Sequence, residues 1–205
     1  MKQMKNDTVR ARLLQCAVRH FAEKGYAGTN LMEVAAEAGV TRGPLYYYFS
    51  GKADLYEAAV AQQIEEKREA YSRILVEDKP FLEMLREDYL YCLQDKGLFS
   101  QIGSGGKDEP DVTAPFREYS QWLIDRKYLA FSAAQARGEI PKECDLSELI
   151  TFIYIYYHGV IYTRSLAAAY RGFNQEMLEN SVEFFLEVIQ KRFLRNALPQ
   201  GPKEP

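Results

Sequence analysis

The chain has 205 residues, of which 47% are hydrophobic and 27% charged, and its formal net charge is −3. This composition excludes a chain that is disordered throughout, because it supplies enough apolar surface for a packed core. Residues 1–50 carry seven Lys or Arg against four Asp or Glu, whereas residues 51–205 carry nineteen against twenty-five. We expect a basic domain over 1–50 that meets phosphate groups and a separate acidic domain over 51–205.

The cysteines and the apolar segments indicate where the protein works. Cys16, Cys92 and Cys144 lie far apart, which predicts reduced thiols rather than a disulfide or a zinc site, with a redox-sensing thiol as the alternative. The N-terminus lacks the apolar centre of a signal peptide. The longest apolar stretch, residues 150–161, is too short to cross a bilayer as a helix. We expect a soluble, cytoplasmic protein.

Helical periodicity dominates the chain from its first segment, where Leu13, Cys16, Ala17 and Phe21 share one face up to Gly25. Strand-like alternation does not stand out, so the predicted fold class is all-α, with three helices in an N-terminal head and a C-terminal helical bundle. After the first helix, the pattern predicts helices over about 30–38, 41–49, 50–75, 80–95, 115–137, 146–169 and 175–196.

Residues 31–55 carry the most specific pattern in the chain. Two short helices meet at Gly39, a residue that tolerates a left-handed turn, and Asn30 and Glu33 have the spacing of a capping box. Such a pair forms a helix-turn-helix unit, whose second helix can enter a DNA major groove about 12 Å wide. On a helical wheel, Leu45 and Phe49 share the inner side of that second helix.

The opposite face of the second helix carries Gly43 and Tyr47, flanked by other tyrosines. Gly43 lets a phosphate approach the backbone, and tyrosine hydroxyls can donate to phosphates while a ring lies against a thymine methyl group. Thr41 can cap the helix or contact a phosphate. Lys52 opposes the macrodipole of the next helix, which an external phosphate would offset. The alternative is that the tyrosines are packing residues.

The same segment resembles the TetR family of transcriptional regulators. In that family a Gly-Tyr and a Thr precede the first motif helix, and an Ala-Gly-Val turn leads to Gly-x-Leu-Tyr-x-x-Phe-x-x-Lys-x-x-Leu. The matching positions in this chain are Gly25, Tyr26, Thr29, Val34, Ala35, Ala38, Gly39, Val40, Gly43, Leu45, Tyr46, Phe49, Lys52 and Leu55. The match covers roughly the first sixty residues, and beyond it only helix pattern and length agree with the family.

The resemblance implies that residues of this motif contact DNA. The candidates are Thr29, Thr41, Arg42, Gly43, Pro44, Tyr46, Tyr47, Tyr48 and Lys52. Many members carry His in place of Tyr48, and Pro44 is unusual, which puts in doubt the operator that is read rather than DNA binding itself. Lys2, Lys5, Arg10 and Arg12 are further basic candidates for the DNA backbone, unless they form a solvated terminus.

The last two predicted helices suit a homodimer, because 149–162 is apolar almost all round and 175–196 carries two apolar stripes. TetR-like proteins pair through these two helices, although an intrachain core would explain part of each stripe. The candidate interface residues are Met177, Val182, Phe184, Phe185 and Val188.

The bundle also predicts a small-molecule site, since pockets between helices are largely apolar with a few polar groups. The candidate lining residues, any one of which could instead be plain core, are Tyr89, Cys92, Leu93, Phe99, Phe116, Tyr119, Trp122, Leu123, Tyr154, Tyr157 and His158. Nearby acidic residues could favour cationic aromatic ligands or form a solvated face; they are Glu87, Asp88, Glu118 and Asp125.

The predicted function is that of a DNA-binding regulator, a repressor released from a palindromic operator when a small hydrophobic or aromatic ligand shifts the population of body conformations. The first alternative is a DNA-binding dimer without an inducer. The second is a helical enzyme or carrier, which the sequence disfavours because it has two histidines and lacks catalytic motifs. We expect no catalytic residue, no cofactor and no metal.

Overall fold

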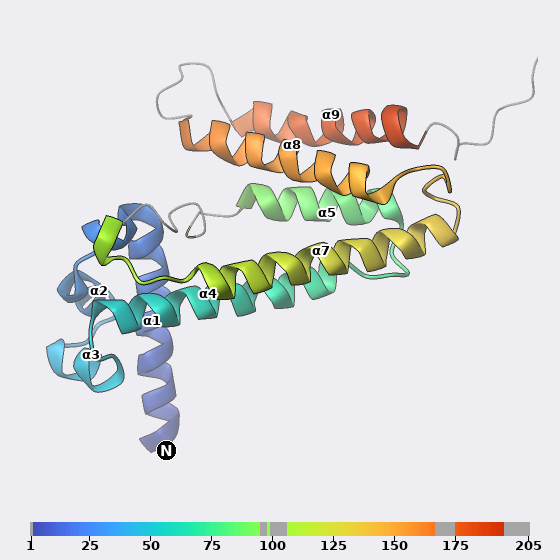
Figure 1. The fold of residues 1–205 in the computed structure, drawn as a ribbon. Coiled ribbons are helices and arrows are strands. Elements are labelled where there is room, and N and C mark those ends of the chain that lie inside the picture. The colour runs from blue at the N-terminus through green and yellow to red at the C-terminus, as the bar shows by residue number, and fades with distance from the viewer. Residues whose placement is uncertain (1, 95–97, 99–105, 167–174, 195–205) are drawn as a thin grey trace, which may run out of the picture. The chain divides into compact units, whose positions relative to one another are not determined.

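The computed structural model describes residues 2–94, 98, 106–166 and 175–194, and within these the side chains of 2–7, 106, 164–166 and 175–179 are left out of the description. Every regular element in this part of the chain is helical (Figure 1). The elements are α1 (Lys2–Gly28), α2 (Leu31–Glu37), α3 (Arg42–Tyr48), α4 (Lys52–Ile74), α5 (Phe81–Gln94), the 3₁₀ turn η1 (Gly106–Asp108), α7 (Thr113–Ala136), α8 (Leu146–Leu166) and α9 (Gln175–Phe193). The all-α prediction is confirmed.

The chain divides into two compact units. The first, here called the head unit, comprises Met1–Glu69 and Lys96–Ser120, and the second, the body unit, comprises Ala70–Asp95 and Gln121–Pro205. Helices α4 and α7 each contribute residues to both units. The functional boundary expected at residue 50 falls inside the head unit and stays a prediction.

Apolar side chains of α1, α2, α3 and α4 form the core of the head unit. Phe21, Leu45 and Leu55 are fully buried and come from three different helices. The ring of Tyr56 meets that of Phe21 edge-on at 4.9 Å between centroids, and its hydroxyl donates to Glu109 Oε1 at 2.6 Å. The segment after η1 is therefore tied to the start of α4.

The regular parts of helices α1 and α2 each end at a glycine with positive φ. Gly25 has φ of 67° and ends the regular part of α1, as the sequence predicts. Gly39 has φ of 68°, its amide donates to Ala36 O, and the next amide, of Val40, donates to Ala35 O. These two bonds form a Schellman motif, which satisfies carbonyls at the end of α2 and turns the chain toward α3.

Aromatic residues of α5, α8 and α9 dominate the core of the body unit. Tyr89 stacks on Phe185 with centroids 5.0 Å apart and meets Tyr157 edge-on at 5.3 Å. On the α7 side of α5, Phe81 and Phe131 meet edge-on at 5.0 Å. Figure 1 shows α5, α8 and α9 running alongside one another, and α5 contacts both of the others.

One ion pair lies inside this apolar core. Lys127 of α7 donates to Asp88 Oδ2 of α5, and the two side chains are 2% and 0% exposed. The Lys127 ammonium lies over the rings of Tyr71 and Tyr157, 5.7 and 5.5 Å from their centroids. Such a pair holds its partners in one arrangement, but its desolvation offsets much of its Coulomb energy.

We predict that Lys127→Met lowers the free energy of unfolding by about 3–5 kcal/mol, because it leaves the Asp88 carboxylate buried without a cation. The double variant Asp88→Asn, Lys127→Met removes both charges but keeps an oxygen for Tyr157, and it should cost less than half as much. Urea unfolding followed by circular dichroism measures both. Equal losses in the two variants would contradict the prediction.

Candidate nucleic-acid interface

Helix α3 has one buried and one exposed face, and the division follows the predicted wheel. Leu45 and Phe49 are buried in the head core. Tyr47 points the other way and is 74% exposed, and Tyr46 beside it is 43% exposed. Large aromatic side chains exposed to solvent are typical of a binding surface, because covering their apolar rings with a partner is favourable.

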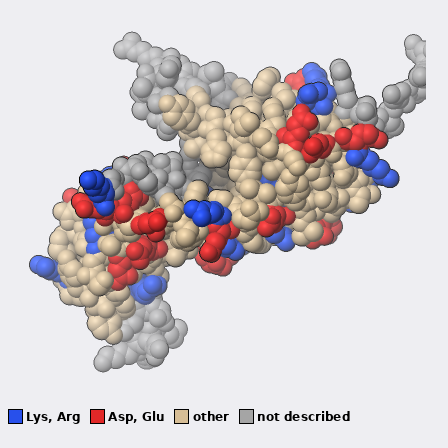
Figure 2. Space-filling view, in the orientation of Figure 1, with Lys and Arg blue, Asp and Glu red and all other residues tan. Residues whose placement is uncertain are grey.

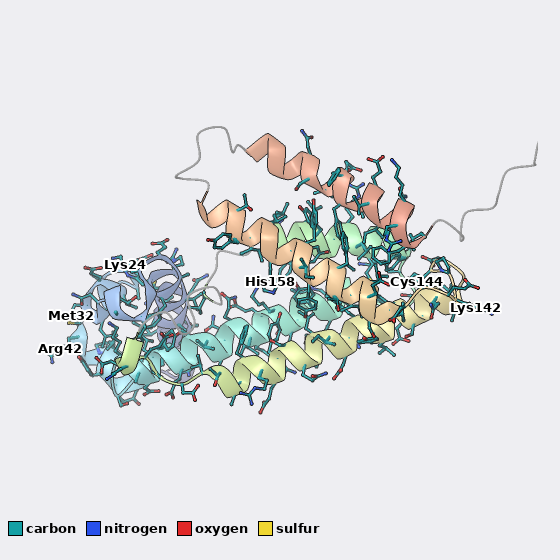
Figure 3. All side chains as sticks on the ribbon, turned by 45° about the horizontal axis from the view of Figure 1, so that its top comes forward. Lys24, Met32, Arg42, Lys142, Cys144 and His158 are labelled. Carbon is teal, nitrogen blue, oxygen red and sulfur yellow. The ribbon has the colours of Figure 1, made fainter. Side chains whose placement is uncertain are left out.

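The start of α3 also presents small and cationic groups to solvent. A Cβ built on Gly43 would meet no atom within 4 Å, so packing within the described residues does not explain its small size. Thr41 is exposed at the N-cap and its side chain makes no capping hydrogen bond, contrary to the capping role that we expected. Arg42, labelled in Figure 3, lies over the Tyr46 ring at 5.1 Å.

The remaining candidates of α3 lie beside its exposed residues. Pro44 and Tyr48 are half-buried, and the Tyr48 ring meets Tyr47 edge-on at 4.9 Å. The exposed set of Thr41, Arg42, Gly43, Tyr46 and Tyr47 is named here the α3 face. It combines hydroxyls, a guanidinium and an open glycine backbone, which are groups that contact phosphates and base edges in the major groove.

Ionic contacts fix α2 against α1. His20 Nε2 lies 2.6 Å from Glu37 Oε2, and Arg19 pairs with the other oxygen of Glu37 at 2.6 Å. Glu33 was expected to complete a capping box, but its carboxylate accepts from Lys24 Nζ at 2.5 Å, which lowers the Glu33 pKa. Asn30 does cap α2, accepting from the Met32 amide at 2.8 Å.

Thr29 occupies an interior position rather than the α3 face. Its side chain is 4% exposed, and its hydroxyl donates to Gly25 O at 2.8 Å across the turn that ends α1. The position gives no support to a contact between this hydroxyl and DNA. The motif position is explained instead by the shape of the α1–α2 turn.

Lys52 also has a partner inside the head. Its Nζ donates to Ala27 O at 3.0 Å and lies 4.9 Å from the centroid of the Tyr26 ring, and burial lowers the Lys52 pKa. The ammonium therefore satisfies a carbonyl in the segment that follows the kink at Gly25. Sequence reasoning missed this contact because its partner lies 25 residues away. A phosphate is not needed to explain this lysine.

Charge on the head is mixed rather than uniformly basic. On the face drawn in Figure 2, described Lys and Arg side chains are interspersed with Asp and Glu. Arg10 lies over the Phe49 ring at 5.5 Å, whereas the side chains of Lys2 and Lys5 lie outside the described residues. Arg12 is exposed. The DNA contacts predicted for the N-terminal stretch stay predictions.

The predicted ligand-site residues fall into two groups in the body unit. Tyr89, Cys92, Leu123 and Tyr157 are buried, and the Tyr89 and Tyr157 hydroxyls bond to Ser181 and Asp88. By contrast, two candidates on α8 line an open groove between α7 and α8. The lining residues are Ile124, Tyr128, Ser147, Ile150, Thr151, Tyr154, Ile155 and His158.

The remaining described candidates differ in burial. Tyr119 is buried and Phe116 is half-buried, both in the part of α7 that belongs to the head unit. Leu93 and Trp122 are half-buried, and Phe99 lies outside the described residues. Among the described candidates, Tyr154 and His158 line the groove, and the shared ligand site stays a prediction.

The dimer candidates on α9 are divided between the core and the surface. Val182 and Phe185 are buried against the body unit itself, whereas Phe184 is 59% exposed and Val188 is half-buried. The side chain of Met177 lies outside the described residues. Two apolar residues of α8 that we did not select, Ile155 and Tyr162, are 68% and 67% exposed. Their seven-residue spacing on an apolar helix was the available signal.

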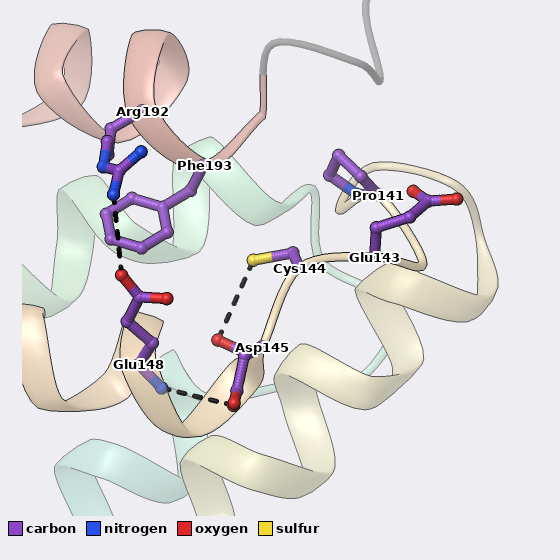
Figure 4. Close-up of a pocket in the computed structure, with 7 residues that line it drawn as sticks. All are labelled: Pro141, Glu143, Cys144, Asp145, Glu148, Arg192 and Phe193. Atoms are coloured by element: carbon purple, nitrogen blue, oxygen red, sulfur yellow. Dashed lines mark hydrogen bonds and ion pairs between the residues drawn. The ribbon is translucent and has the colours of Figure 1, made fainter.

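A second hollow lies where α7 and α8 join (Figure 4). Pro141, Cys144 and Phe193 are among its lining residues, and Arg192 pairs with Glu148 across it at 3.8 Å. Burial raises the Cys144 pKa, and Glu148 and Asp145 raise it further, which makes this thiol a weak nucleophile. Cys16, Cys92 and Cys144 are all free thiols.

Among the described residues, no group of three or more His, Cys, Asp or Glu is arranged to hold a metal ion. None of the described helices combines the length and the apolar character that crossing a membrane requires.

The sequence is similar to a known family of regulatory proteins. A family model described as "Bacterial regulatory proteins, tetR family" matches residues 13–59. The HTH-type transcriptional regulator TtgR of Pseudomonas putida is 26% identical over 164 residues, which cover 74% of this chain and 78% of that protein. A "Probable acrEF/envCD operon repressor" of Escherichia coli is 32% identical over 97 residues, 45% of this chain and 44% of that protein.

Solved structures agree at the level of the fold. A TetR transcriptional regulator from Chloroflexus aurantiacus matches with a TM-score of 0.74 and 22% identity, over 93% of this chain and 98% of that one. A helix-turn-helix head joined to a helical body defines a DNA-binding transcriptional regulator. Residues 13–59 match the TetR-family model, and the resemblance to TetR-family regulators seen in the sequence is confirmed.

We predict that Lys52→Met lowers the free energy of unfolding by about 1 kcal/mol, because it removes the cation from Ala27 O and from the Tyr26 ring. Tyr47→Ala, a change on the α3 face, should shift stability by less than about 0.5 kcal/mol. Urea unfolding of both variants tests the difference. A Lys52→Met protein as stable as the parent would show that the ammonium is not an internal cap.

Proposed function

We propose that this protein is a repressor that binds a palindromic operator as a homodimer and leaves it when a small hydrophobic or aromatic molecule binds the body. The observation that carries the DNA-binding part is the α3 face, with Tyr47 74% exposed above a buried Leu45. Repression is supported by the printed name of the Escherichia coli relative. Such a regulator acts in the cytoplasm, where its operator lies.

A homodimer follows from the size of the recognition element. One α3 of seven residues covers only part of a specific site, so two heads spaced about one helical turn of DNA apart are needed for tight binding. Ile155 and Tyr162 on α8 and Phe184 on α9 are exposed apolar side chains that a partner subunit would cover. Val182 and Phe185 support this surface from beneath instead of contacting the partner.

In the proposed release mechanism, the helices that contribute residues to both units, α4 and α7, connect the ligand site to the head. Helix α4 begins in the head at Lys52 and continues into the body unit, and the hydrogen bond between Tyr56 and Glu109 ties a second segment to its head end. A ligand that prefers one arrangement of the body changes the position of α4 and hence the spacing of the heads. A coupling of about 1–3 kcal/mol weakens DNA binding by roughly 5–150-fold.

The α3 face is tested on DNA that flanks the protein's own gene. Gly43→Ala should leave the protein at least as stable, because its Cβ meets no neighbour within 4 Å, yet it should weaken operator binding about tenfold by blocking close backbone approach. Tyr47→Ala should weaken binding to a similar extent. Fluorescence anisotropy at one fixed salt concentration measures the affinities.

Tyr47→Phe is the matched control for the hydroxyl of that tyrosine, since it keeps the ring. If Gly43→Ala and Tyr47→Ala both retained the parent affinity, the α3 face would not be the DNA-binding surface.

The dimer surface is tested by charge substitution. Ile155→Glu and Phe184→Glu should each produce monomers, because burying a carboxylate against apolar residues is strongly unfavourable. Leu129→Glu is the control, since Leu129 is also exposed and apolar, at 46%, but lies on α7. Sedimentation velocity distinguishes the species. Dimers that persist in both variants would move the interface elsewhere.

A further inference from the structure

Arg42 supplies the positive charge of the α3 face, and its hydrogen-bond donors have no acceptor in the described part of the chain. The side chain is exposed, and its Cζ lies over the Tyr46 ring, 5.1 Å from the centroid. Other arginines are paired, since Arg19, Arg86 and Arg137 contact glutamates at 2.6, 2.6 and 2.5 Å. The guanidinium of Arg42 is therefore open to an acceptor that another molecule brings.

The contact with Tyr46 holds this guanidinium in place without using its donors. Arg42 and Tyr46 are four residues apart on α3, so they share one side of the helix. A cation over an aromatic ring interacts with the π face, which leaves every N–H free for hydrogen bonds. The contact also restricts a long side chain before it binds, which lowers the entropy cost of ordering it on DNA.

The position of Arg42 on α3 favours a base over the DNA backbone. The buried side chains of Leu45 and Phe49 fix the rotation of the helix, and Arg42 is its first residue. In a helix-turn-helix, side chains from the first turn of the second helix are those that contact base edges in the major groove.

The chemistry of the guanidinium then selects one base. Its donors form a rigid planar fork, which matches two acceptors that lie side by side. Guanine presents such a pair in the major groove, N7 and O6, whereas adenine places an amino donor next to N7 and cytosine presents an amino donor. Thymine offers a single acceptor beside a methyl group.

We propose that Arg42 recognises one guanine in each half-site of the operator by donating to N7 and O6, and that Tyr46 is the positioning residue that orients the guanidinium. This inference rests on the proposed function, because it names the base that the α3 face recognises. Arg42 thereby determines sequence specificity, whereas the hydroxyls of the same face contact phosphates.

The test replaces guanines one at a time by 7-deazaguanine, which lacks the N7 acceptor but still pairs with cytosine. Footprinting first locates the bound site on DNA that flanks the protein's own gene. Fluorescence anisotropy at one fixed salt concentration should then show that the parent protein loses about tenfold in affinity at one guanine of each half-site.

Arg42→Ala should lose about tenfold on the unmodified operator and nothing further when that guanine is replaced, because the two changes remove the same contact. Arg12→Ala is the matched control, since it removes an exposed arginine from α1 of the same head. It should keep the tenfold preference for guanine. If Arg42→Ala weakened binding to the same extent at every modified site, the arginine would contact phosphate and the proposal would be overturned.

Tyr46→Phe and Tyr46→Leu separate the ring of Tyr46 from its hydroxyl. Both variants lack the hydroxyl, so a phosphate contact made by that group is lost equally in the two. The preference for guanine over 7-deazaguanine should stay about tenfold in Tyr46→Phe, which keeps the ring under Arg42, and fall to about threefold in Tyr46→Leu. Equal preferences in the two variants would refute the positioning role.

The same measurements separate this inference from the proposed function. If the parent protein binds the operator but no 7-deazaguanine position distinguishes it from Arg42→Ala, DNA recognition stands and the assignment of the base is wrong. If the parent protein protects no site on the DNA, the proposed function fails and this inference fails with it.

Discussion

The burial of Leu45 and Phe49 against α1 and α2 is the constraint on which the function of the head depends. A helix of seven residues has little stability of its own, so α3 exists only because these two side chains anchor it in the core. The anchoring fixes the rotation of α3 about its axis. That rotation in turn directs Tyr47, Gly43 and Arg42 outward together, and one apolar contact thus sets the orientation of the α3 face.

The sequence predicted these features because they depend on short-range geometry. Helical periodicity and the turn at Gly39 determine the helix-turn-helix unit, and the wheel separates Leu45 from Tyr47 without knowledge of any partner. The internal contacts of Lys52 and Thr29 were not predicted, since their partners are backbone carbonyls at the end of α1. Residue type and motif spacing contain no information about which group a lysine or threonine side chain will meet.

The body was predictable in outline only. Helical periodicity placed Val182, Phe184 and Phe185 on apolar stripes of one helix. Such a stripe cannot distinguish an intrachain contact from a contact between subunits, and Phe185 is stacked on Tyr89 of the same chain. The Asp88–Lys127 pair joins residues 39 positions apart, and no local pattern distinguishes a buried acid from a solvated one. The polar centre inside this aromatic core was therefore not predictable from the helix pattern.

Helix α4 has a mechanical consequence for regulation. Its 23 residues span about 35 Å at 1.5 Å per residue, and it contains no glycine or proline at which it could bend. A rigid rod of that length amplifies motion: a tilt of about 5° about one end moves the other by about 3 Å. In the dimer proposed above, such a tilt of α4 would change the separation of the two heads by a distance comparable to the length of a hydrogen bond.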